Sequence, residues 1–196
     1  MSKQEKREFR SVKTELRAAS EGRRVEGYAV RFEEWSRDLG GFKEIIHAGA
    51  ISQDLIDKSD VVMCINHDEN KMLARHKEGK GTLELELKAD GLYFSFDAPE
   101  TELGNQLLHD VRSGNLDECS FAFSLDWDDD NADYWHREDD GLKREIFTIA
   151  GLYDCSIVTH AAYPTTSVSA RGEQMVAKDE EVEAAMDAID KEIDNL

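Results

Sequence analysis

Residues 82–97 of the chain read TLELELKADGLYFSFD, and this stretch indicates what kind of fold to expect. Leucines alternate with polar residues over 82–88, and the apolar residues Leu92, Phe94 and Phe96 alternate in the same way after Asp90-Gly91. Alternation with a period of two predicts two half-buried strands, and the Asp-Gly pair between them predicts a hairpin.

Similar patterns on both sides of this hairpin predict more strands and few helices. The clearest helix begins after Thr101, a good N-cap, and ends at Gly114. We expect a mostly antiparallel α+β protein, built as a small β-barrel or sandwich with a few surrounding helices. The remaining predicted elements are strands over 24–32, 42–47, 61–65, 119–127 and 144–159, the last with a bulge at Gly151, and a short helix over 48–56.

The charge balance excludes several classes of partner. Against 24 Lys and Arg stand 43 Asp and Glu, which gives a net charge of −19. A nucleic-acid binder or a protein of anionic membranes needs a basic surface, so we expect neither partner. No apolar run approaches the roughly 18 residues of a membrane span, and no secretory signal opens the chain. Three cysteines make no disulfide framework. Together these observations predict a cytoplasmic protein.

The distribution of charge suggests how the chain is divided. We expect a disordered N-terminal arm over 1–8 and a folded domain over 9–172, from which residues 126–141 project as an acidic exposed loop. Residues 126–140 carry eight acids against one arginine, and the tail over 173–196 carries nine acids against two lysines. The tail is also amphipathic, with Asp179 as a reasonable N-cap, and such a short helix needs a partner surface. That surface is either its own domain, a partner protein, or a second subunit in a homodimer.

Three polar residues lie in or directly after apolar strands. His67 follows the strand over 61–65, Ser120 shares a strand face with the small Ala122 and Ser124, and Asp154 lies within an apolar strand, where a carboxylate needs a partner. Together they form the set of nucleophile, base and acid used in serine hydrolysis, which geometry rather than chain order defines. Taken singly, each also fits a structural role: a surface histidine, a backbone-bonded serine and the partner of an arginine.

Other candidate chemistry is weaker. Strand parity places Cys119 on the opposite face from Ser120, so a cysteine nucleophile is disfavoured. Cys64 and His67 have metal-like spacing, but no second pair completes a zinc site. The acids at 126, 128 and 130 imitate a calcium loop whose sixth and twelfth positions, Asn131 and Arg137, do not fit. We therefore expect no metal and no cofactor.

Several linked segments resemble the prohead protease family of tailed bacteriophages. The resemblance runs from about Arg24 to Arg171, so it covers nearly the whole predicted domain. The segments that carry it are residues 40–50 (GGFKEIIHAGA), 66–68 (NHD), 117–123 (DECSFAF) and 152–164 (LYDCSIVTHAAYP).

This resemblance implies a herpesvirus-protease-like fold, because the family is taken to share its fold with the herpesvirus capsid maturation proteases. It implies a serine endopeptidase that cleaves scaffold or capsid-protein segments, and often itself, inside the immature capsid in the host bacterial cytoplasm. Carried over by position, His67 and Ser120 match the family's catalytic histidine and serine, and Asp154 falls where the family usually has Glu or Asp.

The sequence departs from the family pattern in two places. Cys119 stands where a hydrophobic residue such as Met is common, and His160-Ala161 replaces an aromatic-proline pair. The herpesvirus relatives use a second histidine as third member, so His160 competes with Asp154 for that role. Residues 154 and 160 lie roughly 20 Å apart on a straight strand, and only one can reach His67. We favour Asp154, because Pro164 and the small residues near 161 suggest that His160 lies at the strand end.

A second class of function fits the charge pattern without catalysis. In this alternative, the protein is a non-enzymatic assembly module of the prohead, whose acidic loop and tail hold a scaffold protein. Such a module would not need His67, Ser120 and Asp154 together in the family order.

Overall fold

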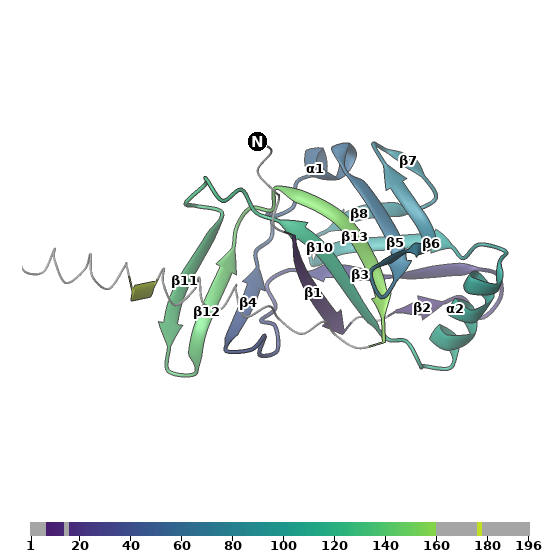
Figure 1. Cartoon of the computed structure of the whole chain (residues 1–196), viewed down its shortest axis with the longest axis horizontal. Coiled ribbons are helices and arrows are strands. Elements are labelled where there is room, and N and C mark those ends of the chain that lie inside the picture. The colour runs from purple at the N-terminus through teal and green to yellow at the C-terminus, as the bar shows by residue number, and fades with distance from the viewer. Residues whose placement is uncertain (1–6, 14–15, 160–175, 178–196) are drawn as a thin grey trace, which may run out of the picture.

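The computed structural model describes residues 7–13, 16–159 and 176–177 of the chain (Figure 1). This part is rich in strands and contains two helices of more than one turn, as the sequence predicted. The strands form three separate sheets, and among the described residues none of these closes on itself into a barrel.

The largest sheet has six strands and carries the candidate site. Its order is β1-β10-β13-β5-β6-β7, and all neighbours are antiparallel except β13 and β5, which run parallel. The strands are β1 (Glu8–Lys13), β10 (Glu118–Ser124), β13 (Gly151–Val158), β5 (Asp60–Ile65), β6 (Asp68–Lys77) and β7 (Lys80–Gly81).

The other two sheets have four and three strands. The four-stranded sheet, in the order β2-β3-β9-β8, consists of β2 (Arg17–Ala18), β3 (Arg24–Arg31), β9 (Gly91–Asp97) and β8 (Glu84–Lys88). The three-stranded sheet, in the order β11-β12-β4, lies to one side in Figure 1 and consists of β11 (Asp133–Glu138), β12 (Gly141–Ile146) and β4 (Phe42–Ile46).

The hairpin predicted from residues 82–97 is confirmed. Strands β8 and β9 pair with Leu87 opposite Leu92 and Lys88 opposite Gly91, which leaves a two-residue turn. Gly91 is required by a close approach to β3, because a Cβ there would lie 2.1 Å from the carbonyl oxygen of Val30. The apolar residues of β9 are fully buried, so the alternation correctly identified the core face.

Both helices begin at side-chain caps. In α2 (Glu102–Arg112), the Thr101 hydroxyl accepts from the backbone N–H of Gly104, as the sequence predicted. The first helix, α1 (Gln53–Lys58), begins later than the predicted start at residue 48. Ser52 is its N-cap and accepts from the N–H of Leu55 at 3.1 Å, so the polar cap, rather than the apolar spacing, sets the start.

Some predicted boundaries are wrong. The loop expected over 126–141 contains strand β11, because Trp135 is buried and Asp133 is neutralised by an arginine. At the N-terminus, Glu8 already belongs to β1, inside the arm predicted over 1–8. The predicted strand over 144–159 is divided into β12 and β13, and the irregular register of β13 falls at Tyr153 rather than at Gly151.

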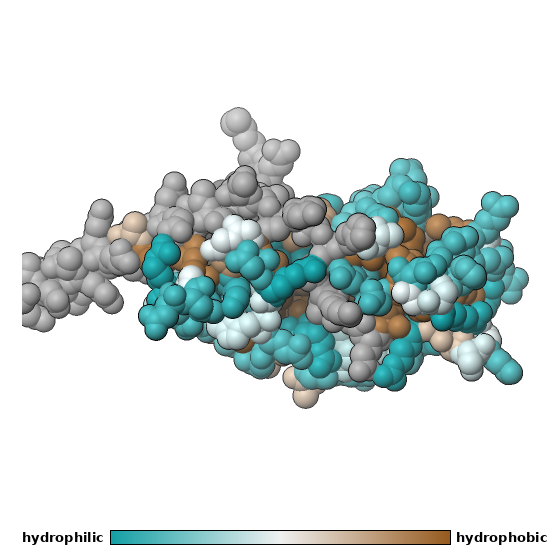
Figure 2. All heavy atoms as spheres, turned by 90° about the horizontal axis from the view of Figure 1, so that it is seen from below, coloured by the Kyte–Doolittle hydropathy of each residue, from teal (hydrophilic) through white to brown (hydrophobic). Residues whose placement is uncertain are grey.

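The main core fills the space between the six-stranded and four-stranded sheets. It draws buried apolar side chains from β3, β9, β10 and β13 and from α2. A smaller cluster covers the three-stranded sheet and includes Val176, a residue of the tail predicted over 173–196. Val176 therefore packs on its own domain. On the face shown in Figure 2, the described residues are mostly hydrophilic, with apolar side chains visible between the polar ones.

Five buried charges join the edge strand β1 to the three-stranded sheet. Arg10 of β1 donates to Glu8 at 2.6 Å and to Glu44 of β4 at 2.7 Å. Arg144 of β12 donates to Glu8 at 2.6 Å, to Glu44 at 2.9 Å and to Asp133 of β11 at 2.8 Å. Because every guanidinium and carboxylate has ionic partners, the charges can be buried together.

The charges of this network fix one another's ionisation. Burial alone would raise the pKa of Glu8, but the positive charges and hydrogen bonds of Arg144 and Arg10 outweigh burial and lower the pKa to about 2. The carboxylate therefore stays ionised at neutral and mildly acidic pH, and the link between the sheets persists over that range.

We predict that Arg144→Met lowers the free energy of unfolding by about 3–5 kcal/mol, because the three buried carboxylates of Glu8, Glu44 and Asp133 all lose this guanidinium. Arg75→Met is the matched control, since Arg75 also forms a two-point pair, with Asp60, but at the surface. Urea unfolding followed by tryptophan fluorescence measures both variants. Equal losses for the two variants would show that the buried network adds no stability of its own.

Candidate active site

Strand pairing brings the predicted site residues to one face of the six-stranded sheet. In the ladder of β10 and β13, Ser120 lies opposite Ser156 and Ala122 lies opposite Asp154. Because side chains alternate along a strand, Ser120, Asp154 and Ser156 share a face. Strand β5 is the parallel neighbour of β13, so its end brings the following histidine beside them.

His67 lies in the tight turn between β5 and β6. Ile65 pairs with Asp68, and the two residues between them, Asn66 and His67, have φ values of +53° and +58°. Two successive left-handed residues are characteristic of a type I′ hairpin turn, and His67 has a side chain that disfavours this conformation. The turn is fixed to β13 by a hydrogen bond from Asn66 N to Ile157 O of 3.1 Å and by one from His67 N to Ser156 Oγ of 3.1 Å.

The imidazole of His67 lies within hydrogen-bond distance of both Ser120 and Asp154. His67 Nε2 is 2.8 Å from Ser120 Oγ, and His67 Nδ1 is 2.7 Å from Asp154 Oδ1. Asp154 accepts the Nδ1 proton of the imidazole, which leaves Nε2 free to accept the hydroxyl proton of Ser120. The structure thus brings together Ser120, His67 and Asp154 in the order that serine hydrolysis requires, whereas His160 lies outside the described residues.

The site is largely enclosed. Ser120 is fully buried, while the side chains of His67 and Asp154 are 20% and 12% exposed. Phe9 of β1 packs its ring edge-on against the imidazole, with 4.7 Å between ring centroids. Sequence reasoning did not identify this neighbour, because only the pairing of β1 with β10 brings Phe9 to the site face.

Sequence reasoning also missed Ser156. Its hydroxyl donates to Asp154 Oδ1 at 3.0 Å and lies 3.0 Å from Cys64 Sγ. The signal was present in the sequence, since residues two apart on a strand share a face. The sequence alone does not show which strand lies beside this one, however, so it could not predict that the hydroxyl of Ser156 contacts the backbone of His67.

The cysteines near the site are poor nucleophiles. Cys119 belongs to the main core, on the opposite face from Ser120, and burial raises the pKa of its thiol. Burial also raises the pKa of Cys64 to about 11, although the hydrogen bond with Ser156 opposes the shift. No group of three His, Cys, Asp or Glu side chains in the described ranges could hold a metal ion.

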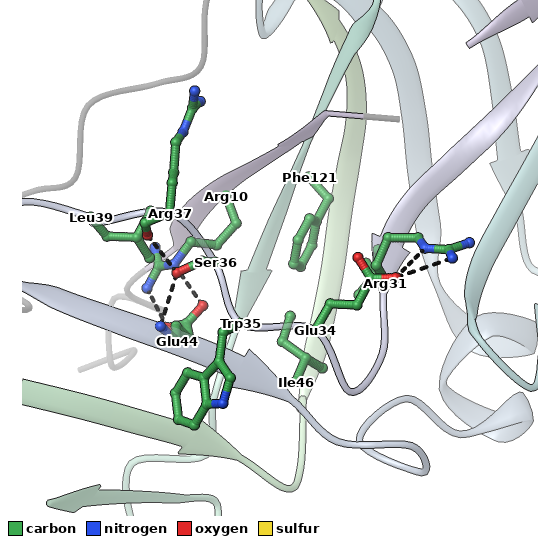
Figure 3. Close-up of a pocket in the computed structure, with 11 residues that line it drawn as sticks. Arg10, Arg31, Glu34, Trp35, Ser36, Arg37, Leu39, Glu44, Ile46 and Phe121 are labelled. Atoms are coloured by element: carbon green, nitrogen blue, oxygen red, sulfur yellow. Dashed lines mark hydrogen bonds and ion pairs between the residues drawn. The ribbon is translucent and has the colours of Figure 1, made fainter. Parts of the chain in front are cut away.

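A separate cavity of about 260 Å³ lies on the other face of β1 and β10 (Figure 3). Arg10 and Phe121, which pair across these strands, line it together with Trp35 and Ile46. Because Phe121 neighbours Ser120 in the strand, their side chains point to opposite faces. The cavity is therefore not the space in which a substrate would meet Ser120.

Fold and site together define the class of protein. A serine hydroxyl, an imidazole and a carboxylate joined in this order are the arrangement found in serine hydrolases on unrelated folds.

In the part of the chain that the structure describes, no helix is long and apolar enough to cross a membrane.

Comparison with known proteins identifies the family. The sequence profile described as caudovirus prohead serine protease matches residues 10–181, and the chain belongs to this family. It is accordingly a serine protease of phage proheads that acts in capsid maturation. No curated protein matches the sequence.

One solved structure that is similar is the bacteriophage T4 capsid assembly protease, gp21. The match covers 78% of this chain and 98% of that chain, with a TM-score of 0.49 and 11% sequence identity.

We predict that iodoacetamide at pH 8 leaves the native protein unmodified, because the three thiols are buried and their pKa values are raised. Intact mass measures the modification, and the urea-unfolded protein, which should take up three carbamidomethyl groups, is the control. Labelling by a fluorophosphonate after this treatment should equal that of untreated protein. A loss of labelling that follows alkylation of Cys119 would contradict the assignment of this thiol to the core.

Proposed function

We propose that Ser120 is the nucleophile of this protease, His67 its general base and acid, and Asp154 the group that orients the imidazole. The observation that carries the proposal is the continuous relay from Asp154 Oδ1 to His67 Nδ1 at 2.7 Å and from His67 Nε2 to Ser120 Oγ at 2.8 Å. The relay matches the geometric requirement for a catalytic triad, in which each contact is a direct hydrogen bond.

The relay supports a two-step hydrolysis. Ser120 Oγ attacks the carbonyl carbon of the scissile peptide bond while its proton passes to His67 Nε2. The imidazolium, stabilised by Asp154, then gives that proton to the leaving amine, and the C–N bond breaks to leave an acyl-enzyme. Water repeats the sequence: it gives one proton to His67, its oxygen attacks the ester carbonyl, and Ser120 recovers the proton as the acid product leaves.

We predict that Ser120→Ala and His67→Ala each lower the rate of proteolysis by about 10⁶-fold, and Asp154→Asn by about 10⁴-fold. His160→Ala should keep activity within about threefold of wild type, since Asp154 already occupies the Nδ1 side of His67. Intact-mass analysis of the cleaved capsid protein after co-expression, together with fluorophosphonate labelling, measures all four variants. An inactive His160→Ala with an active Asp154→Asn would give the third position to His160, and an active Ser120→Ala would refute the mechanism.

The substrates we propose are scaffold or major capsid-protein segments inside the immature capsid, and the protease's own chain. Membership of the prohead protease family supports this assignment. We propose neither nucleic acid nor membrane as a partner, because a net charge of −19 opposes both. Co-expression of wild-type or Ser120→Ala protein with the neighbouring capsid protein tests the substrate. If the protein is a non-enzymatic assembly module, the capsid protein has the same mass in both co-expressions.

We also propose that the three sheets correspond to the barrel of the herpesvirus maturation proteases. The strand-rich fold and the site in the largest sheet support this relation. An experimental structure of the complete chain tests it, and sheets that remain open at both edges would refute it.

The acidic tail is the proposed docking segment for a capsid or scaffold partner or for a second subunit. Because Val176 packs against Trp135 and Leu142, the docking segment is best taken to begin after Ala177. We predict that a chain ending at residue 177 keeps its melting temperature and its fluorophosphonate labelling but loses incorporation into proheads. A chain ending at 175, which also lacks Val176, is the comparison and should melt at a lower temperature. Unchanged incorporation of the chain ending at 177 would remove the docking role.

A further inference from the structure

We propose that Ser156 is a positioning residue of the protease, which holds the backbone of His67 and the carboxylate of Asp154 in a fixed relation. The proposal deepens the function proposed above and rests on it. The observation behind the proposal is that the hydroxyl of Ser156 contacts both His67 and Asp154. Ser156 lies two residues after Asp154 on the same strand and the same face of the sheet.

The hydrogen-bonding capacity of this hydroxyl is fully used. Ser156 Oγ lies 3.0 Å from Asp154 Oδ1, 3.1 Å from the backbone nitrogen of His67 and 3.0 Å from Cys64 Sγ. A carboxylate only accepts, so the hydroxyl proton goes to Asp154. The N–H of His67 and the thiol of Cys64 then donate to the two lone pairs of the oxygen. A hydroxyl has one donor and two acceptor positions, and all three are occupied.

The position of the hydroxyl explains why it matters for His67. Both Asn66 and His67 have left-handed backbone conformations, which surrounding contacts must hold in place. Ser156 binds the backbone of this turn, while Asp154, two residues earlier on β13, binds the ring. The histidine is therefore fixed at its backbone and at its side chain by the same strand.

The position of the hydroxyl also fixes the carboxylate. The proton of Ser156 and the Nδ1 proton of His67 are both directed at Oδ1 of Asp154. Without the hydroxyl, that oxygen would lose one of these two donors, and the N–H of His67 would lose its acceptor. The ring could then turn away from the line to Ser120 Oγ, which would slow proton transfer without altering the surface that a substrate contacts.

Ser156→Ala tests the proposal, with Ser124→Ala as the matched control. Ser124 lies on the same face of the same sheet and is also buried. Its hydroxyl forms a hydrogen bond of 2.8 Å with the hydroxyl of Tyr153, which is not one of the proposed catalytic residues. The measured quantities are the two constants for labelling by a fluorophosphonate: the maximal rate of labelling and the probe concentration for half that rate. Thermal unfolding of both variants is measured alongside.

We expect Ser156→Ala to lower the maximal labelling rate about tenfold to a hundredfold and to leave the half-saturating concentration within about twofold. Ser124→Ala should leave both constants within about twofold of wild type. In the Asp154→Asn background, adding Ser156→Ala should lower the rate by a smaller factor than it does in the wild-type background, because the part of its effect that acts through Asp154 is already lost there.

Three outcomes would overturn the proposal. These are equal rate losses in the two serine variants, an undiminished effect of Ser156→Ala in the Asp154→Asn background, and a change in the half-saturating concentration alone. Ser120→Ala distinguishes this failure from that of the proposed function. If Ser120→Ala abolishes labelling while Ser156→Ala labels normally, only the positioning role is wrong; if Ser120→Ala still labels, the triad itself is wrong.

Discussion

The parallel pairing of β13 with β5 is the constraint on which the site depends. In a sheet whose other neighbours are antiparallel, this pair places Ile65, the last residue of β5, beside Ile157 near the end of β13, and Asn66 N bonds to Ile157 O at 3.1 Å. The turn that follows β5 therefore begins beside Ile157, and it brings His67 back to Ser156 and Asp154. Because β10 pairs with β13 on the other side, Ser120 reaches the same imidazole from across that strand.

Much of the fold could be predicted from local patterns, where one face of an element is apolar and a cap or turn marks its end. The hairpin over 82–97 and helix α2 are of this kind. Strand β11 could not be predicted in this way, because its acidic residues read as a solvated loop. Its burial depends on Arg144, a residue of another strand that neutralises Asp133. Long-range charge pairing leaves no periodic signal in the sequence.

The residues of the candidate site could be predicted from strand parity and from the resemblance to a known family. Parity separated Ser120 from Cys119, and the structure places Cys119 in the main core. It could not reveal the left-handed turn at His67, because neither Asn66 nor His67 is a glycine, and it could not reveal the contact of Ser156 with that turn. Both features depend on which strands are neighbours, and no single segment specifies that.

The buried charges at Arg10 and Arg144 connect this site to the rest of the molecule. Strand β1 is an edge strand, paired only with β10 among the described strands, and it carries Phe9, which packs against the imidazole of His67. Arg10, the next residue, points to the opposite face and bonds to Glu44 of the three-stranded sheet. An edge strand with a single neighbour is weakly held by backbone pairing alone. The ion network therefore fixes β1 from the side away from the candidate site, so that Phe9 remains against the imidazole of His67.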